Sequence, residues 1–149
     1  MPRKALSLVG RGEQGLTLVE LLVVFLIIGV LAAIALPAFA GELKASDDAG
    51  AKSDARNLLS SVEGCYLWTD DYSGCDSPSE LELDGVEFGT NPGQAAVMAA
   101  TEDSFVITAF SRARTNGVNH VFTIVKKPVA TTRTCTPHGA GGCPDSGEW

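Results

Sequence analysis

An uninterrupted apolar segment near the start of the chain constrains the fold more than any other feature. Glu20 and Glu42 bracket 21 residues, Leu21 to Gly41, and none of them is charged. At a rise of about 1.5 Å per residue, a helix of this length covers about 30 Å and matches the hydrocarbon core of a bilayer. Apolar side chains fill every side of it, so the segment predicts a helix surrounded by lipid or by other helices.

Three residues of this segment have specific physical consequences. Glu20 is a lone carboxylate at the start of the segment, and an acidic side chain at the centre of a membrane helix costs about 2.5–3.5 kcal/mol, less near the interface. Pro37 lacks an amide hydrogen and clashes with the carbonyl four residues earlier, which predicts a kink or a local loosening around residues 33–37. Gly29 is the single glycine inside the helix predicted from Leu16 to Phe39.

Charge is distributed unevenly along the 149 residues, which have a formal net charge of -7. Residues 1–15 hold three basic side chains and one acidic one, whereas the chain after Gly15 holds 8 basic and 17 acidic side chains. By the positive-inside rule, the basic head stays in the cytoplasm and the acidic remainder crosses the membrane. The basic residues are scattered and the chain is acidic, which argues against nucleic-acid binding over the whole surface.

All four cysteines follow the apolar segment. Cys65 and Cys75 are ten positions apart, and Cys135 and Cys143 are eight apart. An exported domain meets an oxidising compartment in which cysteines pair, and of the three possible connectivities the short spacings favour the two local ones. The spacing has no CxxC pair and neither histidine sits at a usual ligand offset, so zinc binding is disfavoured.

The remainder of the chain predicts a small α+β domain. Apolar residues recur at spacings of four and three on one face of an amphipathic helix that runs to about Asp70, and these are Ala51, Ala55, Leu58, Val62 and Cys65. This helix joins the apolar helix into one element of about 55 residues, unless Gly50 interrupts it. Residues 76–104 are acidic and rich in turn-forming residues, which predicts a loop with short extended pieces near 81–83 and 86–88.

Two strands are predicted after this loop. Residues 105–110 and 121–125 are rich in β-branched and aromatic side chains and form an antiparallel hairpin with a longish loop that contains Asn116-Gly117. Alternate residues of each strand are expected to cover the amphipathic helix and close the core, and these are Phe105, Ile107, Ala109, Phe122 and Ile124. The tail after Pro128 is predicted to be a loop tied by a bridge between Cys135 and Cys143.

A basic leader precedes a specific run of residues at the start of the apolar segment. The run reads Gly15-Leu16-Thr17-Leu18-Val19-Glu20-Leu21-Leu22-Val23-Val24, with Gly29 and Pro37 further along. It resembles the class III signal of type IV pilins and of their pseudopilin relatives. The close resemblance covers residues 11–40, and a looser one extends through residues 54–58 and the hairpin with its late cysteine loop. Where the family usually has phenylalanine at its new terminus, this chain has Leu16.

The resemblance implies a long helix packed on a small antiparallel sheet, and it implies a processing route. A prepilin peptidase on the cytoplasmic face would cleave between Gly15 and Leu16 and N-methylate Leu16. Gly15 has no side chain and allows the extended backbone that a protease needs. We expect the Leu16 amine of a neighbouring subunit to pair with Glu20 and set the axial register, because subunits out of register leave both charges unpaired. Gly29 and Pro37 would let the packed helices bend.

We therefore expect a leader at 1–15, a transmembrane and filament-core helix at 16–40, and a periplasmic or extracellular head at 41–149 whose helix runs to about residue 71. The precursor would span the inner (cytoplasmic) membrane once, and the mature chain would be a non-enzymatic subunit of a type IV pilus at the cell surface, with no cofactor and no metal. The implied partners are membrane lipid before assembly, copies of itself in a helical filament, the peptidase, and an inner-membrane assembly platform with a separate ATPase. A type II secretion pseudopilin or a minor pilin is the alternative, although the cysteines and the hairpin favour the pilins of motility and adhesion.

Two other readings of the apolar segment stay open. Ala38-Phe39-Ala40 before Gly41 has the small-x-small form of an ordinary signal peptidase site, which would release a secreted domain. The apolar stretch is longer than an ordinary signal of about 7–15 residues and contains Glu20 at its start, both of which argue against that site. A simple membrane anchor for a small periplasmic domain is the other reading, with Glu20 reaching the interface.

Three other groups of side chains after the apolar segment are candidate sites. His120 and His138 lack any nucleophile motif or metal spacing, so we expect solvated loop residues rather than an enzyme. Six acidic residues could bind Ca²⁺ through oxygen, but their spacing matches no EF-hand and favours a solvated face; they are Asp70, Asp71, Asp76, Glu80, Glu82 and Asp84. Tyr66, Trp68 and Tyr72 are expected to cover the small core rather than to form a stacking surface.

Overall fold

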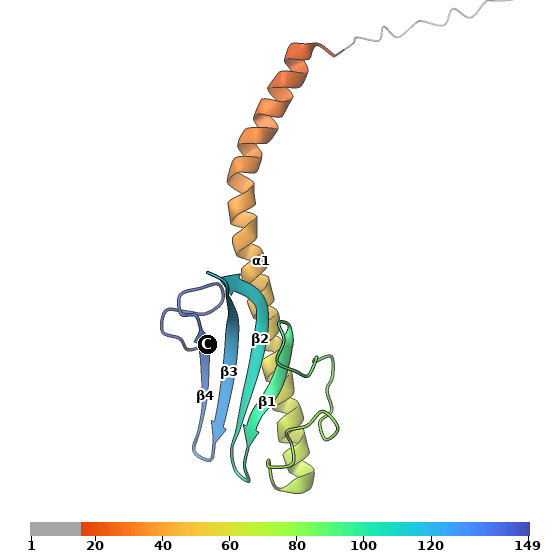
Figure 1. Ribbon diagram of the computed structural model, residues 1–149, viewed down its shortest axis with the longest axis vertical. Helices are drawn as coiled ribbons and strands as arrows, with labels where there is room; N and C mark the ends of the chain where they lie inside the picture. Colours follow the sequence, from red (N-terminus) through yellow and green to blue (C-terminus); the bar gives the residue numbers. More distant parts are fainter. Residues whose placement is uncertain (1–15) are drawn as a thin grey trace, which may run out of the picture. The chain divides into compact units, whose positions relative to one another are not determined.

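The computed structural model describes residues 16–149, so the predicted leader at 1–15 lies outside the described residues. One long helix is followed by four strands that form a single antiparallel sheet in the order β1-β2-β3-β4 (Figure 1). The elements are α1 Leu18–Thr69, β1 Gln94–Ala100, β2 Phe105–Thr115, β3 Val118–Lys127 and β4 Ala130–Thr136. The chain divides into two compact units, one ending at Pro37 and the other comprising Ala38–Trp149, and each is described by itself. The α+β prediction is confirmed.

Helix α1 is a single element of 52 residues. Thr17 precedes it and caps it, because its hydroxyl accepts the amide hydrogen of Glu20 at 3.2 Å and its carbonyl accepts that of Leu21. The helix remains α-helical through both Pro37 and Gly50, so the two predicted helical stretches do join. It begins two residues later than predicted and ends close to the predicted position.

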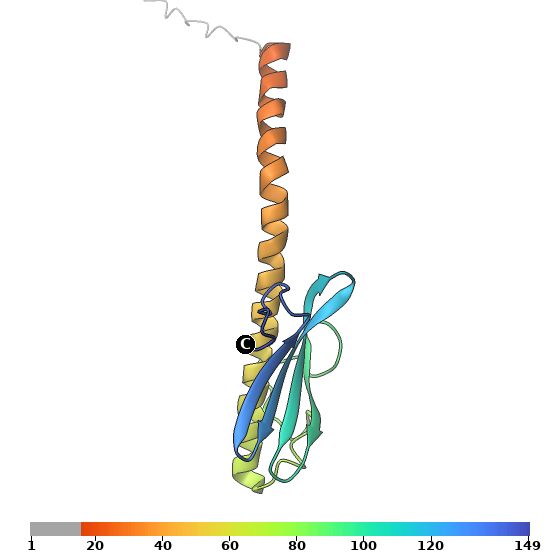
Figure 2. The same cartoon turned by 90° about the vertical axis from the view of Figure 1, so that its left-hand side faces the viewer.

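The core of the second unit lies between α1 and one face of the sheet, and Figure 2 shows the sheet on one side of the helix. The predicted helix face is buried at Ala51, Ala55, Leu58 and Val62. The predicted strand residues are buried opposite them: Phe105, Ile107, Ala109, Phe122 and Ile124, none more than 2% exposed. Burial of large apolar side chains contributes about 1.5–3 kcal/mol each, so these two faces hold the head together.

The sheet has two more strands than the sequence predicted. Strand β1 lies inside the stretch 76–104 that was expected to be a loop, and β4 lies in the tail that was expected to be irregular. Their sequences explain the error, because β1 reads QAAVMAA, in which alanine disfavours strands, and β4 reads ATTRTCT, in which Cys135 is the single buried residue and no apolar alternation appears. Both strands gain their stability by pairing with the long central hairpin, which local sequence does not reveal.

The connection between β2 and β3 is also tighter than predicted. The strands continue to Thr115 and restart at Val118, so that Asn116-Gly117 alone make the turn. Both turn residues have positive φ, 52° and 81°, which is the type I′ geometry that suits a two-residue hairpin. The longish loop expected here was therefore wrong, because the strands extend beyond their most apolar residues.

Candidate functional site

The apolar part of α1 is uncovered. Between Leu18 and Leu36 every large apolar side chain is exposed, from 47% at Val23 to 78% at Leu18. The most apolar window of this helix has a mean hydropathy of 3.0, and none of it is buried in the protein. The helix is long and apolar enough to cross a membrane. Such a surface in water would be strongly unfavourable, so this segment requires lipid or other apolar helices around it.

Glu20 lies in the first turn of this helix. Thr17 and Glu20 have the spacing of a capping box, and the Thr17 half is formed by the hydrogen bond to the Glu20 amide. The N-terminal end of a helix favours a carboxylate because the helix dipole is positive there. Among the described residues no side chain pairs with the Glu20 carboxylate, which is exposed. The carboxylate is therefore open to a partner beyond the described residues.

The other residues predicted to act in processing and assembly lie before Glu20 and further along the same helix. Leu16 lies before the helix and is 76% exposed, whereas Gly15 lies outside the described residues. At Gly29, an added Cβ would meet no other atom within 4 Å, so its side of the helix is open for a close approach by another helix. Pro37 lies inside the helix, and the loosening expected there stays a prediction.

Comparison with known families identifies this part of the chain. Residues 10–36 match the family model described as the prokaryotic N-terminal methylation motif. The chain carries the class III signal of type IV pilins and pseudopilins. The match includes Gly15, Leu16, Glu20 and Gly29 and stops one residue before Pro37. No curated protein and no solved structure matched the chain.

Beyond the pilin-type signal, the head contains a buried polar cluster that sequence analysis missed. Asp48 on α1 and His120 on β3 are both fully buried, and Asp48 Oδ2 lies 2.7 Å from His120 Nδ1. The other ring nitrogen of His120 lies 2.8 Å from the Thr115 hydroxyl, and the Gly142 amide donates to the same Asp48 oxygen at 2.7 Å. The cluster joins the helix, the sheet and the C-terminal cysteine loop.

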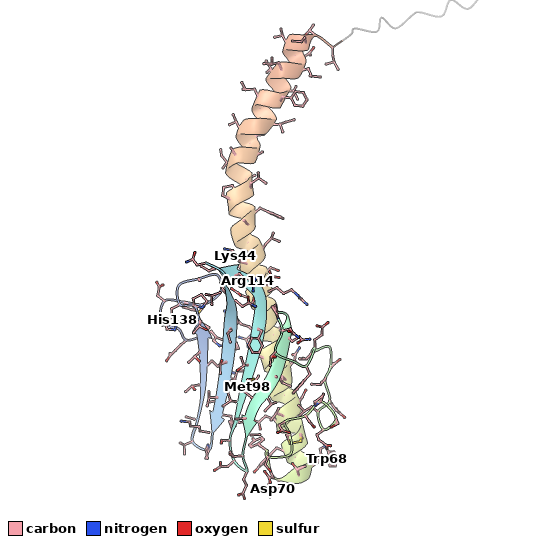
Figure 3. The ribbon with its side chains drawn as sticks, viewed as in Figure 1. Lys44, Trp68, Asp70, Met98, Arg114 and His138 are labelled. Carbon is pink, nitrogen blue, oxygen red and sulfur yellow. A yellow bond between two sulfur atoms is a disulfide. The ribbon has the colours of Figure 1, made fainter. Side chains whose placement is uncertain are left out.

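The expectation that His120 is a solvated loop residue was wrong. The strands extend to include it, and it faces inward with Phe122 and Ile124. Period-two alternation carried back from Phe122 would have found His120, and the helix face carried back from Ala51 would have found Asp48. The expectation for His138 is confirmed, because this side chain is exposed beside the C-terminal loop (Figure 3).

The contacts run from the acid Asp48 through the imidazole of His120 to the hydroxyl of Thr115, which is the order of a catalytic triad. Burial nevertheless indicates a structural cluster. His120 and Asp48 have no exposed side-chain area, and Thr115 only part of its own. The grooves described in the head are lined by other residues. Substrate therefore has no access to His120 in this structure. The pilin-type signal independently points to a structural subunit.

Aromatic and acidic residues gather at the end of α1. Tyr66 stacks on Tyr72, and Tyr72 packs edge-on against Phe105, as expected for residues that cover the core. Tyr72 also donates its hydroxyl hydrogen to Glu63 at 2.7 Å, and burial together with this bond raises the pKa of Tyr72 well above its ordinary value. Trp68 differs from the expectation, because it is 92% exposed and does not cover the core.

Trp68 instead lines a shallow groove of about 440 Å³ together with three of the predicted acidic residues, Glu80, Glu82 and Asp84. Across residues 16–149, no three potential metal ligands come close enough together to hold an ion. The Ser73 amide donates to the Asp71 carboxylate at 2.7 Å and lowers its pKa.

The cysteines form the two local pairs that the spacing favoured, Cys65–Cys75 and Cys135–Cys143. The first joins the end of α1 to the loop that follows it. The second closes the C-terminal loop whose Gly142 amide binds Asp48, and the Lys52 ammonium donates to the Gly142 carbonyl at 2.6 Å. The second bridge thus fixes a loop that has little apolar surface of its own.

Proposed function

We propose that this chain is the precursor of a structural subunit of a type IV pilus. The observation that carries the proposal is the combination of a pilin-type signal with an apolar helix that is uncovered along its whole membrane-length segment. In the precursor, lipid covers this surface and a single-pass membrane protein results. In the filament, the helices of other copies replace the lipid.

Processing prepares the chain for this exchange. A prepilin peptidase cleaves between Gly15 and Leu16 and methylates the new Leu16 amine, without removing the apolar helix. The new amine then lies four residues before Glu20. An inner-membrane platform with its own ATPase supplies the work of extraction from lipid, since the chain itself carries no catalytic site in this proposal.

Glu20 specifies the register of the filament. Its carboxylate is free for a partner from another copy, and the Leu16 amine of a neighbouring subunit is the positive group that processing creates. In the low-dielectric interior of a helical bundle, an unpaired charge costs several kcal/mol, so only a register that pairs the two charges is stable.

Replacement of Glu20 tests the filament role. Glu20→Ala is expected to leave cleavage after Gly15 largely intact and to reduce surface filaments at least tenfold, because the register is no longer specified. The measurement is the amount of processed subunit in membranes and in sheared surface material. Glu42→Ala is the matched control, since it removes the carboxylate that follows the same apolar segment and should leave filaments near the parental level.

Normal filament yield from Glu20→Ala would contradict the register mechanism. If the chain is instead a type II secretion pseudopilin, the same cells would give a different result. The unsubstituted chain would be processed but, at its native expression level, would form no surface filaments. The experiment thus separates the two functions that the pilin-type signal leaves open.

A further inference from the structure

The β2–β3 hairpin ends in an exposed turn, here called the hairpin tip and comprising residues 114–118. Every residue of the tip is exposed except Thr115, which is partly buried. Val118 is 57% exposed although it shares the inward face of β3 with the buried His120. The inward face of the sheet is therefore uncovered at the tip, and an apolar side chain remains at the surface beside the Arg114 guanidinium.

Three contacts show that β3 runs parallel to α1. In order along both elements they are Asp48 with His120, Lys52 with Phe122, and Glu63 with Lys126. From the first contact to the last, the span is about 22 Å along the helix and about 20 Å along the strand, at rises of about 1.5 and 3.3 Å per residue. One strand residue therefore corresponds to about two helix residues.

This correspondence places the hairpin tip level with the end of the apolar segment. Gly117 lies three residues before His120, about 10 Å back along the strand, which equals about seven helix residues before Asp48. That helix position is Gly41, the last residue of the charge-free run. Both positions belong to the second compact unit, and Figure 1 shows the β2–β3 turn at the end where α1 emerges from the head. When the apolar segment spans a bilayer, the tip therefore lies at the membrane surface.

Basic side chains flank the tip on both elements. Lys44 is exposed on α1 seven positions before Ala51, which places it on the helix side that turns toward the sheet. Arg114 is exposed on the hairpin, where its Nε donates a hydrogen bond to Asn119, and Figure 3 shows Lys44 and Arg114 at the same end of the head. Glu42 lies about 200° around the helix from Lys44 and points away from the sheet. Within residues 16–149, neither basic side chain forms an ion pair.

We propose that the hairpin tip binds the headgroup layer of the membrane that the apolar helix spans, with anionic phospholipids as its ligand. The Arg114 guanidinium and the Lys44 ammonium donate to phosphate oxygens of the lipid, and Val118 supplies an apolar side chain at the interface. Basic side chains beside a membrane helix are attracted by the negative surface potential of anionic lipids. This inference rests on the membrane-spanning precursor of the proposed function.

The acidic groove beside Trp68 lies away from the hairpin tip. Its three carboxylates face α1 residues 57–68, which begin about 24 Å beyond Gly41, further than the screening length of about 8–10 Å. Nearer the tip, Asp47 lines a groove of about 250 Å³ together with the oppositely charged Arg112. Local charge at the tip, rather than the net charge of -7, therefore decides its attraction to a lipid surface.

The membrane then holds the precursor at two places, along the apolar helix and at the hairpin tip. The second contact fixes the rotation of the head about α1, because the sheet lies to one side of the helix (Figure 2). Extraction of a subunit therefore has to break the headgroup contact as well as remove the helix from lipid.

A fluorescent label at the tip tests this contact in the full-length, uncleaved chain. All four cysteines are paired, so Val118→Cys introduces one reactive thiol, and Val129→Cys introduces one at the exposed β3–β4 turn as the matched control. The labelled chains are placed in phosphatidylcholine vesicles with or without phosphatidylglycerol, together with a lipid that carries a nitroxide on its headgroup. The two positions lie about 30 Å apart along β3, so in anionic vesicles the nitroxide should quench the label at Val118 at least about fivefold more.

Charge reversal tests which side chains recognise the lipid. Arg114→Glu and Lys44→Glu, each combined with Val118→Cys, should lower the quenching about fivefold, because a basic side chain beside an anionic surface strengthens binding by about that factor. Lys127→Glu makes the same change of charge at the exposed β3–β4 turn and should leave the quenching unchanged. Lys44 lies on the helix, so its variant remains informative if Arg114→Glu disturbs the hairpin turn.

Quenching at Val118 that requires phosphatidylglycerol and falls in either charge-reversed chain supports the proposal. Three results would overturn it: equal quenching at Val118 and Val129, equal quenching in the two kinds of vesicle, or full quenching in both charge-reversed chains. In the first case the tip does not reach lipid, and in the other two it lies near the bilayer without binding anionic headgroups.

A label within the apolar segment separates failure of this contact from failure of the proposed function. Leu31 lies in the middle of the charge-free run, so a label on Leu31→Cys should be quenched by a lipid that carries its nitroxide on an acyl chain. Absence of that quenching would overturn the membrane-spanning precursor together with the contact. Quenching at Leu31 without quenching at Val118 would overturn the contact alone.

Discussion

Asp48 is the residue on which three parts of the head converge. Its buried carboxylate accepts from the Gly142 amide and contacts His120 Nδ1, and its second oxygen has no partner in the described part of the chain. The carboxylate therefore regains only part of the hydrogen bonding that it loses on leaving water. Its contacts with His120 and with the Gly142 amide are correspondingly important for the stability of the head.

Asp48→Ala is expected to lower the free energy of unfolding of the head by about 3 kcal/mol, because His120 and the Gly142 amide would both be left buried without a partner. Urea titration followed by tryptophan fluorescence measures this change. Asp47→Ala is the matched control at the preceding position, which is partly exposed, and it should change the free energy of unfolding by less than about 0.5 kcal/mol. Equal effects of the two substitutions would contradict the role given to the cluster.

Tyr72 predicts a dependence of stability on high pH. Burial and the hydrogen bond to Glu63 raise its pKa in the folded state, so folded Tyr72 keeps its proton at a pH where the unfolded chain has lost it. The unfolded state then binds fewer protons, and stability must fall as pH rises above about 10.

The measurement for Tyr72 is the free energy of unfolding at about pH 9 and pH 11, in the parent and in Tyr72→Phe. The variant is expected to lose stability less steeply over this interval, since it has no hydroxyl to ionise. A slope as steep in Tyr72→Phe as in the parent would show that other groups carry the pH dependence.

At the scale of elements, the turn between β2 and β3 depends on a backbone conformation that favours glycine. Gly117 has φ of 81°, and an added Cβ there meets no atom within 4 Å. Gly117→Ala should therefore cost about 1 kcal/mol from backbone strain alone. Gly50 is equally open but helical, so Gly50→Ala should stabilise the head by about 0.5–1 kcal/mol. The same sign for both substitutions, in parallel urea titrations, would contradict this account.

The elements that sequence predicted are those whose side chains repeat with a clear period. The face from Ala51 to Val62 and the alternation in β2 and β3 were both visible, and the structure buries those residues. Strands β1 and β4 were missed because their stability comes from pairing with neighbours. Strand β1 is rich in alanine, which is depleted in strands, and β4 has no apolar alternation along its length.

The candidate site also has one part that the sequence predicted and one part that it did not. The pilin-type signal is contiguous in sequence and was identified from it. The cluster of Asp48 and His120 joins residues 72 positions apart and depends on strand ends that were placed too early. Long-range pairs of this kind follow only once the full strands are known.

At the scale of the whole molecule, the chain combines a head with its own core and an apolar helix that no part of that core covers. A head stabilised by two disulfides can persist outside the cell, while the apolar helix requires lipid or other copies around it. We propose that this helix is kept after processing and becomes the assembling part of the subunit.

Retention of the helix is tested by the N-terminal residue and the intact mass of the protein recovered from sheared cell-surface material. We expect a chain that begins at Leu16, carries one methyl group on its terminal amine and retains the whole apolar helix. A chain that begins at Gly41 would contradict the proposed function, because cleavage after Ala40 would release a secreted head without the segment through which we propose that it assembles.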